Sequence, residues 1–363
     1  MYPSEIATDK VAESLIRKHF SLESKLVGDY PKTVSLHAFA RLAAIKNDKT
    51  LREECRQMLN PYITGEVTHN MGSFKHYNIG GNATAYFAWA VNSDALKPLL
   101  KEHCDKLTSG HRGVSGLLIG DHEGLLSRFN LTDEQYWIDK LFGTVPFLLF
   151  SGLLLGDNSY LDEACAQIKG MVDVFRNPQN GLYHQCYGFT GPGRPGLGKI
   201  TEDHWSRGNG WGLIALTEMA NYLPQTHARR KEMEKIFTDH VVACLKFQDK
   251  NGLWHQEMTR TDSFVETSGS GFILYALGVA LEKKLLAQKE TEKLLQGLRG
   301  MASYIGMDSS MHNTCEGCCC PGKGMIADYM AKPHPMNDPH GFGPVSLAFS
   351  QAYNLGIKSI AIA

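Results

Sequence analysis

The sequence lacks the features that would place it in several large classes of protein. A membrane-spanning helix needs about 20 consecutive apolar residues, whereas the longest uncharged stretch, residues 141–156, is broken by Gly143, Pro146 and Gly152. Lys and Arg number 37 and Asp and Glu number 38, which gives a formal net charge of −1. No surplus of charge draws the chain toward nucleic acid or an anionic membrane surface, and we expect it to bind neither.

Several catalytic and targeting motifs are also absent. There is no G-x-x-x-x-G-K-[ST], H-E-x-x-H or G-x-S-x-G, so nothing supports a phosphate-binding loop, a zinc protease or a serine hydrolase. The N-terminal residues contain no apolar segment of the kind found in secretory signals. Five of the nine cysteines are scattered and indicate reduced thiols: Cys55, Cys104, Cys165, Cys186 and Cys244. These features predict a cytoplasmic protein.

Helical periodicity dominates the sequence, and strand signals are scarce. Three segments carry apolar residues at i, i+3 and i+4 on one face only; they begin at Leu161, Met233 and Leu294. Four others are apolar nearly all round: residues 137–156, 211–222, 271–281 and 343–353. A helix without a polar face has to be covered on both sides. The alternation therefore predicts an all-α fold with buried helices inside and amphipathic helices outside, in two concentric layers.

An internal repeat supports this organisation. The motif NGLYHQ of Asn180–Gln185 recurs 71 residues later as NGLWHQ in Asn251–Gln256, and a helix start rich in small residues follows each copy. A period of about 60–70 residues, with one short turn and two helices, indicates stacked helical hairpins. Six such hairpins would use most of the chain in one closed ring, and no linker-like stretch interrupts it. We therefore predict a single domain over residues 1–363.

The first clear buried helix opens with Tyr136-Trp-Ile-Asp139. A carboxyl group among aromatic and apolar neighbours has a raised pKa, which suits a general acid near neutral pH. Asp139 could equally be a helix cap or a first-turn acid that complements the helix dipole. Position alone leaves both roles open.

The stretch Trp205-Ser-Arg-Gly-Asn-Gly-Trp211 is the most informative part of the sequence. Arg207 offers a planar guanidinium that can bind a carboxylate. Trp205 and Trp211 offer flat faces to a sugar ring or to a stacked guanidinium. The same sequence pattern would also arise from a pair of core tryptophans with a structural arginine.

Other polar residues precede the buried helices. His184 could donate a hydrogen bond to a ligand, and its repeat partner His255 is as good a candidate by pattern. Glu266 with Ser268 and Ser270 is typical of a helix N-terminal cap, and so is the segment 337–344. Cys315 and Cys318 have zinc-type C-x-x-C spacing, but no second pair follows, and consecutive Cys318, Cys319 and Cys320 cannot easily surround one ion. We expect a tight loop and no metal.

Taken together, these segments resemble glycoside hydrolase families 105 and 88, the unsaturated rhamnogalacturonyl and glucuronyl hydrolases. The order and approximate spacing agree from about residue 120 to the end, and W-x-R-G-N-G-W is the most specific element. The motifs that carry the resemblance are Tyr136–Asp139, Gly181–His184, Trp205–Trp211, Gly252–Gln256, Glu266–Ser270, Asn337-Asp338 and Gly341–Pro344.

The resemblance implies an (α/α)6 barrel and an enzyme that needs no metal or cofactor. The implied reaction removes a 4,5-unsaturated uronic acid from the non-reducing end of oligosaccharides made by polysaccharide lyases. The vinyl ether is hydrated, with the aspartic acid matched by Asp139 as general acid and base. The family's substrate-binding positions match His184, Trp205, Arg207, Asn209 and Trp211.

One departure from the family pattern is important. These families carry a second aspartate on an earlier inner helix, usually as D-x-I-N-x-G, whereas this sequence has Lys75-His-Tyr-Asn-Ile-Gly-Gly81 with no acid. His76 or Asn78 takes that place and is predicted to bind substrate. The loss leaves hydration possible with Asp139 alone, but puts the substrate geometry in question.

Three alternatives remain open from the sequence. An exo-acting β-glucuronidase of the same fold would cleave saturated glucuronides and need a second carboxylate, for which Glu266 or Asp203 is available. A sugar epimerase would use paired histidine bases such as His184 and His255. A non-catalytic helical-repeat binding protein would place Asp139 in packed core.

Overall fold

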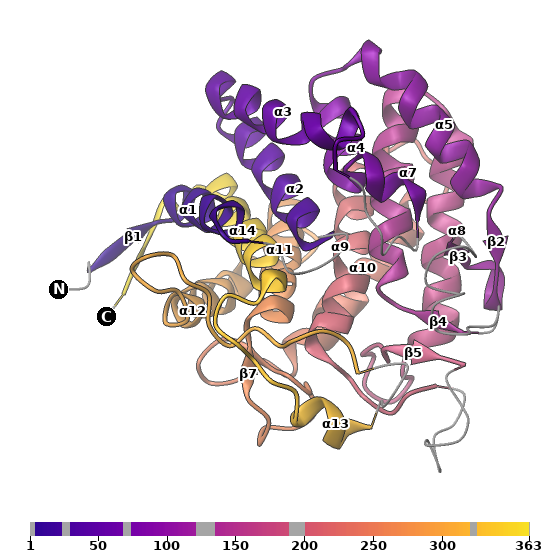
Figure 1. Ribbon diagram of the computed structural model, residues 1–363. Helices are drawn as coiled ribbons and strands as arrows, with labels where there is room; N and C mark the ends of the chain where they lie inside the picture. Colours follow the sequence, from indigo (N-terminus) through magenta and orange to yellow (C-terminus); the bar gives the residue numbers. More distant parts are fainter. Residues whose placement is uncertain are drawn as a thin grey trace.

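The computed structural model describes residues 4–23, 30–67, 74–120, 135–188, 200–319 and 325–362. This part of the chain is mostly helical (Figure 1). Within it, six helices form an inner ring: α2 (Tyr30–Ile45), α4 (Gly81–Ala90), α7 (Lys140–Leu155), α9 (Ser206–Tyr222), α11 (Thr267–Glu282) and α14 (Pro339–Asn354). Each packs against the next in this order, and α14 packs against α2. The ring is therefore closed by helices from the two ends of the chain.

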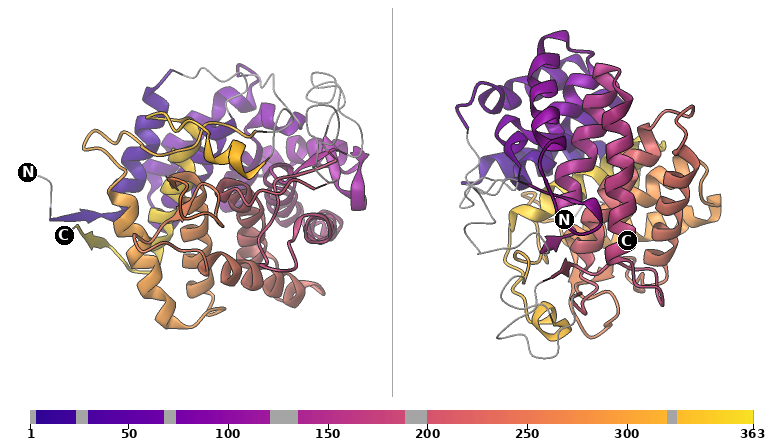
Figure 2. Two further views of the ribbon diagram at one scale, coloured as in Figure 1. Left: turned by 90° about the horizontal axis from the view of Figure 1, so that it is seen from below. Right: turned by 90° about the vertical axis from the view of Figure 1, so that its right-hand side faces the viewer.

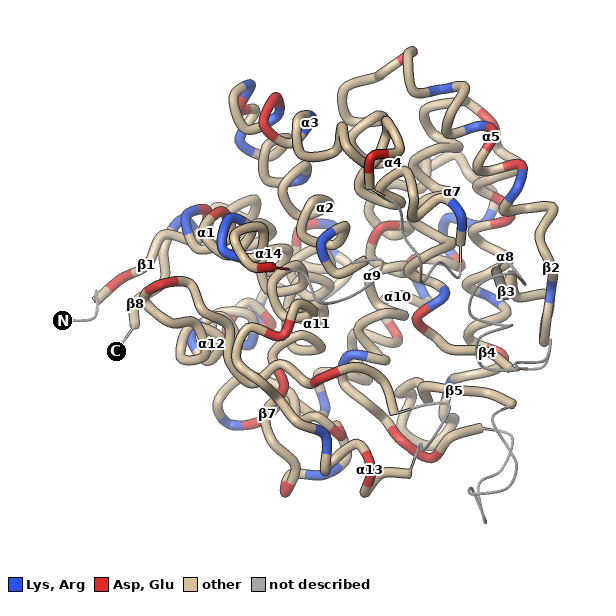
Figure 3. The backbone as a smooth tube through the Cα atoms, viewed as in Figure 1, with Lys and Arg blue, Asp and Glu red and all other residues tan. Residues whose placement is uncertain are grey.

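An outer helix covers each junction of the ring. Among the described residues the outer helices are α1 (Thr8–Ser21), α3 (Lys49–Ile63), α5 (Lys97–Thr108), α8 (Asn158–Phe175), α10 (Arg230–Leu245) and α12 (Thr291–Ala302). Charged residues of both signs gather on outer helices such as α1, α3 and α5 (Figure 3). This arrangement confirms the predicted (α/α)6 barrel with two concentric layers.

The four segments predicted to be buried all round are α7, α9, α11 and α14, and nearly every residue of each is buried. The three predicted half-buried helices are α8, α10 and α12. A short helix, α13 (Ile326–Met330), lies in the connection before α14. None of the described helices has the length and apolar character needed to cross a membrane.

Short two-stranded antiparallel ladders join segments of the chain outside the helices. The strand pairs are β1 (Glu5–Ala7) with β8 (Ser359–Ala361), β2 (His111–Arg112) with β3 (Leu118–Gly120), β4 (Tyr136–Trp137) with β5 (Cys186–Tyr187), and β6 (Trp254–His255) with β7 (Val265–Glu266). The β1–β8 pair brings the two ends of the described chain together (Figure 2). The β4–β5 and β6–β7 pairs join each copy of the repeat to the segment just before an inner helix.

The repeat needs its glycines for a backbone reason. Gly181 and Gly252 have φ of +81° and +85°, in the left-handed region that favours glycine. A side chain at position 252 would also collide with the backbone of Gln296 and Gly297. The second turn therefore sits directly against the next outer helix, and both copies keep the glycine.

A buried ionic network joins three inner helices. Glu218 of α9 receives hydrogen bonds from Tyr275 of α11 at 2.6 Å and from Arg41 of α2 at 3.4 Å, and His37 Nε2 lies 3.2 Å away. Burial raises the pKa of Glu218, but the charge of Arg41 and the bonds from His37 and Tyr275 outweigh it, so the net pKa is lowered. Glu218 is therefore charged in the folded protein.

Glu218→Leu is expected to lower the free energy of unfolding by about 3–5 kcal/mol, because it leaves the Arg41 guanidinium buried without its counter-charge. Urea denaturation at pH 7 measures this loss. Glu102→Gln, in the exposed pair with Lys106, is the control and should change the stability far less, because solvent screens an exposed ion pair. Since the folded pKa of Glu218 is lowered, its contribution is present at neutral pH and is lost as the pH falls, so the two proteins should converge in acid. Equal losses at pH 7 would contradict the prediction.

Candidate active site

The starts of the inner helices bring the predicted polar residues to one end of the ring. Asp139 directly precedes α7, Arg207 lies in the first turn of α9, and Glu266 directly precedes α11. The charge of Arg207 acts on Asp139, on Asp338 before α14 and on Tyr30 at the start of α2. Residues far apart in the sequence therefore share one electrostatic environment.

Asp139 has the N-cap position of α7, yet its side chain accepts no capping hydrogen bond. In contrast, Glu266 caps α11 through the amides of Ser268 and Gly269, and Asp338 caps α14 through the amide of His340. Asp139 keeps partial exposure beside buried Tyr136 and Trp137. The helix-cap interpretation thus fails for this residue, and its carboxyl group is available for other chemistry.

The pKa of Asp139 is raised to about 7, chiefly by burial and further by Cys318. The Gln185 amide and the Arg207 charge oppose the rise. Gln185 Nε2 donates to both carboxylate oxygens, at 3.0 and 3.1 Å. A carboxylic acid that keeps its proton near pH 7 is what proton transfer to a weakly basic atom requires.

The position of the Gln185 amide beside Asp139 depends on Gly208. A Cβ atom at position 208 would overlap Oε1 of Gln185, so the first turn of α9 leaves room for the amide that holds Asp139. The repeat partner Gln256 has a parallel task, because its Oε1 accepts the indole N–H of Trp205 at 3.0 Å. The last residue of each repeat copy therefore supports one residue of the site.

Gln185→Leu is expected to move the alkaline limb of the pH profile of kcat/KM to higher pH. Both hydrogen bonds to the ionised carboxylate are lost, the pKa of Asp139 rises, and the acid form persists to higher pH. We expect about a tenfold loss of rate as well, since the carboxyl group is no longer held. Gly208→Ala should move the limb in the same direction. Gln256→Leu, which does not touch Asp139, is the matched control, and an unmoved limb in Gln185→Leu would refute the role.

Arg207 is 1 % exposed and lies over the ring of Trp205, with Cζ 4.5 Å from the ring centroid. Its Nη1 donates to Ser268 Oγ at 3.1 Å and to the Cys315 carbonyl at 2.6 Å, and Nη2 donates to the Glu316 carbonyl at 3.2 Å. Nε has no hydrogen-bond partner among the described residues. The guanidinium thus holds the loop at 315–316 and retains donor capacity.

His184 lies beside His204, with ring centroids 4.6 Å apart. Burial lowers the pKa of His184 to about 4, and His204 adds to the effect, so the ring is neutral at pH 7. Nδ1 is buried with no partner among the described residues. The repeat partner His255 is placed differently, because its ring contacts Asp249 and the Ser263 carbonyl.

Asn209 and Trp211 are held inside the protein. Asn209 is fully buried; its Oδ1 accepts from the Tyr183 amide, and its Nδ2 donates to the carbonyls of Tyr183 and Trp205. Trp211 is 2 % exposed and contacts Phe142 and other rings. Both positions therefore fix α9 against the repeat turn and against α7. The polar atoms of Asn209 are thus bonded within the protein, and its role in substrate binding stays a prediction.

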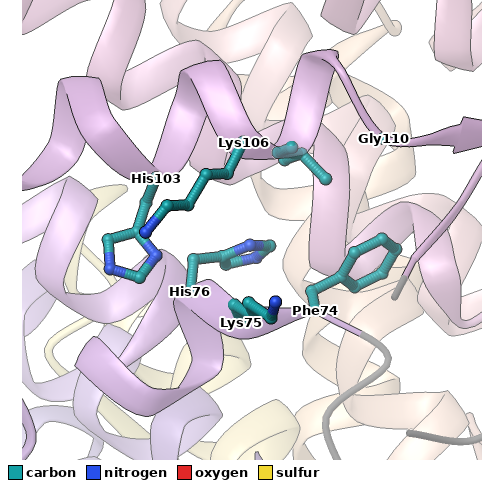
Figure 4. Close-up of a pocket in the computed structure, with 7 residues that line it drawn as sticks. Phe74, Lys75, His76, His103, Lys106 and Gly110 are labelled. Carbon is teal, nitrogen blue, oxygen red and sulfur yellow. The ribbon is translucent and has the colours of Figure 1, made fainter. Parts of the chain in front are cut away.

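The side chain of His76 packs against helix α7. It belongs to a short 3-10 helix, η1 (Lys75–Ile79), its ring stacks on Phe147 at 4.1 Å, and its Nε2 lies 2.6 Å from the Gly143 carbonyl. The cavity that it lines also includes His103 and Lys106 of outer helix α5 (Figure 4). At about 20 Å³ it holds no more than a water. His76 is therefore buried against α7, whereas Asn78 stays partly exposed, and a substrate-binding role for either residue stays a prediction.

The cysteine loop reaches the site through one thiol. Cys318 Sγ lies 3.6 Å from Gln185 Nε2 and 3.3 Å from the Tyr329 hydroxyl. Cys315 is fully buried, and its thiol lies 2.8 Å from Gln256 Nε2. No cluster of three potential metal ligands occurs in the described ranges; Cys320 lies outside them. The loop thus packs against the two repeat glutamines.

Sequence reasoning missed several neighbours of Asp139. Gln185 carried a signal, since it ends a repeated motif. Tyr30 and Tyr77 carried none: the charge of Asp139 raises the pKa of both in addition to the effect of burial, but they lie more than 60 residues earlier in the chain.

Two curated proteins match part of this chain. An unsaturated rhamnogalacturonyl hydrolase, YesR, of Bacillus subtilis is 27% identical over 144 residues, which is 40% of each chain. An unsaturated 3S-rhamnoglycuronyl hydrolase of Formosa agariphila is 28% identical over 162 residues, 43% of each chain. The aligned segments thus span less than half the length of these curated relatives.

Solved structures share the fold over nearly the whole chain. A family 105 glycoside hydrolase of C. acetobutylicum superimposes with a TM-score of 0.80 at 20% identity, over 95% of this chain and 99% of that one. The unsaturated glucuronyl hydrolase of Bacillus sp. GL1 gives 0.66 at 13%, over 97% and 96%. The family model of glycosyl hydrolase family 88 matches residues 6–355, and the chain belongs to that family.

Proposed function

We propose that the protein removes a 4,5-unsaturated uronic acid from the non-reducing end of an oligosaccharide by hydrating its vinyl ether. The observation that carries the proposal is the state of Asp139: its side chain is partly exposed, it caps no helix, and its pKa is raised to about 7. Family membership and the names of the two curated relatives support the same reaction.

Asp139 supplies the proton in the proposed reaction. Its O–H proton passes to C4, the C4=C5 electron pair forms the new C–H bond, and positive charge develops on C5 and the ring oxygen. Water then bonds to C5 and returns a proton to the Asp139 carboxylate. The hemiketal opens at the C5–O5 bond, and the resulting hemiacetal at C1 breaks down to release the aglycone alcohol. The atoms balance with one water consumed.

The surrounding residues fit a uronate ring. Gln185 orients the carboxyl group of Asp139. The unpaired Nε–H of Arg207 and the neutral ring of His184 are suited to the sugar carboxylate and its hydroxyls. Because the acid form of Asp139 is the active one, kcat/KM should fall as the pH rises through about 7.

The geometry disfavours the alternatives. For a saturated glucuronide, Glu266 is occupied as a cap and Asp203 is fully buried, so neither can serve as the second carboxylate. For an epimerase, His184 and His255 belong to separate networks. For a binding protein, Asp139 would be expected within packed core, and it is partly exposed.

We place the reaction in the cytoplasm. The eight described cysteines form no disulfide, although Cys315, Cys318 and Cys319 lie on one short loop. Free thiols at such proximity are typical of a reducing compartment.

An absorbance assay tests the proposal. The conjugated double bond of an unsaturated glucuronyl disaccharide absorbs in the near ultraviolet, and hydration removes that absorbance. We expect loss of absorbance together with release of the aglycone sugar, and no cleavage of the matched saturated disaccharide. Cleavage of the saturated substrate alone would favour the β-glucuronidase, and a change in the sugar without aglycone release would favour the epimerase.

A further inference from the structure

A chain of three side chains crosses from α14 to α2 beside Asp139. Asp338 Oδ1 lies 2.7 Å from His340 Nδ1, and His340 Nε2 lies 2.8 Å from the Tyr30 hydroxyl. Asp338 and His340 are 6 and 7 % exposed. The mechanism above uses none of them, and a cap alone explains only the contact of Asp338 with the His340 amide.

The order of donors along the chain is fixed by chemistry. The pKa of Asp338 is lowered, because the bond from His340 and the nearby charges outweigh burial; its carboxylate can only accept, so His340 Nδ1 carries the proton. The pKa of His340 is lowered by burial and by Arg207, so the ring is neutral and Nε2 is an acceptor. The Tyr30 O–H therefore donates to Nε2.

A tyrosine whose proton is already committed presents only lone pairs to anything else. The Tyr30 ring packs 6.0 Å from that of Trp211, and its hydroxyl shares an electrostatic environment with Asp139, Arg207 and Cys318. Tyr30 is thus a hydrogen-bond acceptor of fixed polarity at the same end of the ring as the general acid.

Accessible side-chain acceptors are scarce in this site. Gln185 Oε1 has no hydrogen-bond partner among the described residues, but it is buried against Gly208. The two oxygens of Glu266 accept bonds from Ser206, Ser268, Gly269 and Cys315. Asp139 is a proton donor in its acid form, and Gln185 Nε2 and Arg207 are donors. A uronide ring presents vicinal hydroxyl groups, and each needs an acceptor once it leaves water, since an unpaired buried donor weakens binding.

We propose that Tyr30 accepts a hydrogen bond from a ring hydroxyl of the sugar, and that His340 and Asp338 are positioning residues that hold it in the accepting state. The inference rests on the proposed function for the identity of the ligand. It adds a specificity determinant from α2 and α14 to a site otherwise built from α7, α9 and the repeat turns.

The test is a double-mutant cycle on binding. The dissociation constant of an unsaturated glucuronyl disaccharide is measured by calorimetry in the Asp139→Asn background, which prevents turnover. Tyr30→Phe should weaken binding about tenfold. His340→Leu should weaken it several-fold in the presence of Tyr30 and not at all in the Tyr30→Phe background, because His340 acts through Tyr30.

Two controls separate this role from a structural one. His340→Gln offers Tyr30 an amide oxygen as acceptor and should restore most of the affinity. Tyr160→Phe removes a buried hydroxyl that bonds Asp105 on the outer layer and should leave binding unchanged. Thermal melting of each variant shows that it folds.

The outcomes are distinct. An unchanged dissociation constant in Tyr30→Phe, or a loss from His340→Leu that is equal in both backgrounds, overturns the inference. If Tyr30→Phe lowers kcat of the active enzyme while binding is unaffected, the acceptor serves the attacking water and the assignment to a sugar hydroxyl is wrong. If the wild-type protein binds the unsaturated disaccharide without turning it over, the proposed function is rejected. The double-mutant cycle on binding then still tests the role of Tyr30.

Discussion

Asp139→Asn is expected to lower kcat/KM for an unsaturated disaccharide by at least about a thousandfold. General acid catalysis contributes about 10²–10⁴-fold, and protonation of carbon has no alternative donor at this position. The asparagine keeps the size of the side chain, and its Oδ1 can still accept from Gln185. The measurement is the initial rate of absorbance loss at pH 6, where the wild-type acid is protonated.

The same substitution should leave the protein at least as stable as the wild type. Because the folded pKa of Asp139 is raised to about 7, ionisation opposes folding, and its cost accumulates between the unfolded pKa near 4 and about pH 7. Asp139→Asn removes that cost. Its melting temperature should therefore exceed the wild-type value at pH 8 and match it near pH 4.

Asp203→Asn is the matched control for the activity. Asp203 is another buried aspartic acid, and burial together with Glu257 raises its pKa well above the usual value. Burial disfavours its ionised form, so replacement by the neutral amide should change little. An inactive Asp203→Asn enzyme beside an active Asp139→Asn enzyme would show that the catalytic acid had been misassigned.

The sequence predicted those inner helices that consist mostly of apolar and small residues. Helices α7, α9, α11 and α14 are nearly all apolar or small, so no polar face obscured them. Helix α2 is just as buried, yet it carries His37 and Arg41. Their partner, Glu218, is more than 170 residues away. A buried polar residue looks exposed until its partner is known, so α2 could not be assigned to the inner ring.

The same distinction separates the site residues. Asp139 and Arg207 stood out because each lies within a local run of aromatic and small residues. Gln185 was visible only as part of a repeat, since its contact with Asp139 requires the β4–β5 ladder. Tyr30 and His340 are 310 residues apart; Tyr30 has no local feature that marks it, and the segment containing His340 indicated only a helix cap. Closure of the ring alone brings these two residues together.

Arg207→Met is expected to lower kcat/KM about a hundredfold, the next largest effect after loss of the acid. The substitution removes a charged donor for the uronate carboxylate, worth about 1.5–3 kcal/mol, and raises KM. It also removes a positive charge that lowers the pKa of Asp139, so the alkaline limb should move to higher pH. Arg207→Lys keeps the charge but not the planar fork; KM should rise while the limb stays in place.

Arg41→Met provides the comparison for this prediction. Arg41 is also buried and stacked on an aromatic ring, with Cζ 4.9 Å from the centroid of Tyr275, but it pairs with Glu218. Its loss should reduce stability as much as or more than that of Arg207, and leave KM and the alkaline limb unchanged. If both methionine variants shift the pH profile alike, the effect of Arg207 arises from general loosening of the barrel. If only Arg207→Met does so, the guanidinium acts on Asp139 directly, and the charge that binds the substrate also sets the pH at which the acid is active.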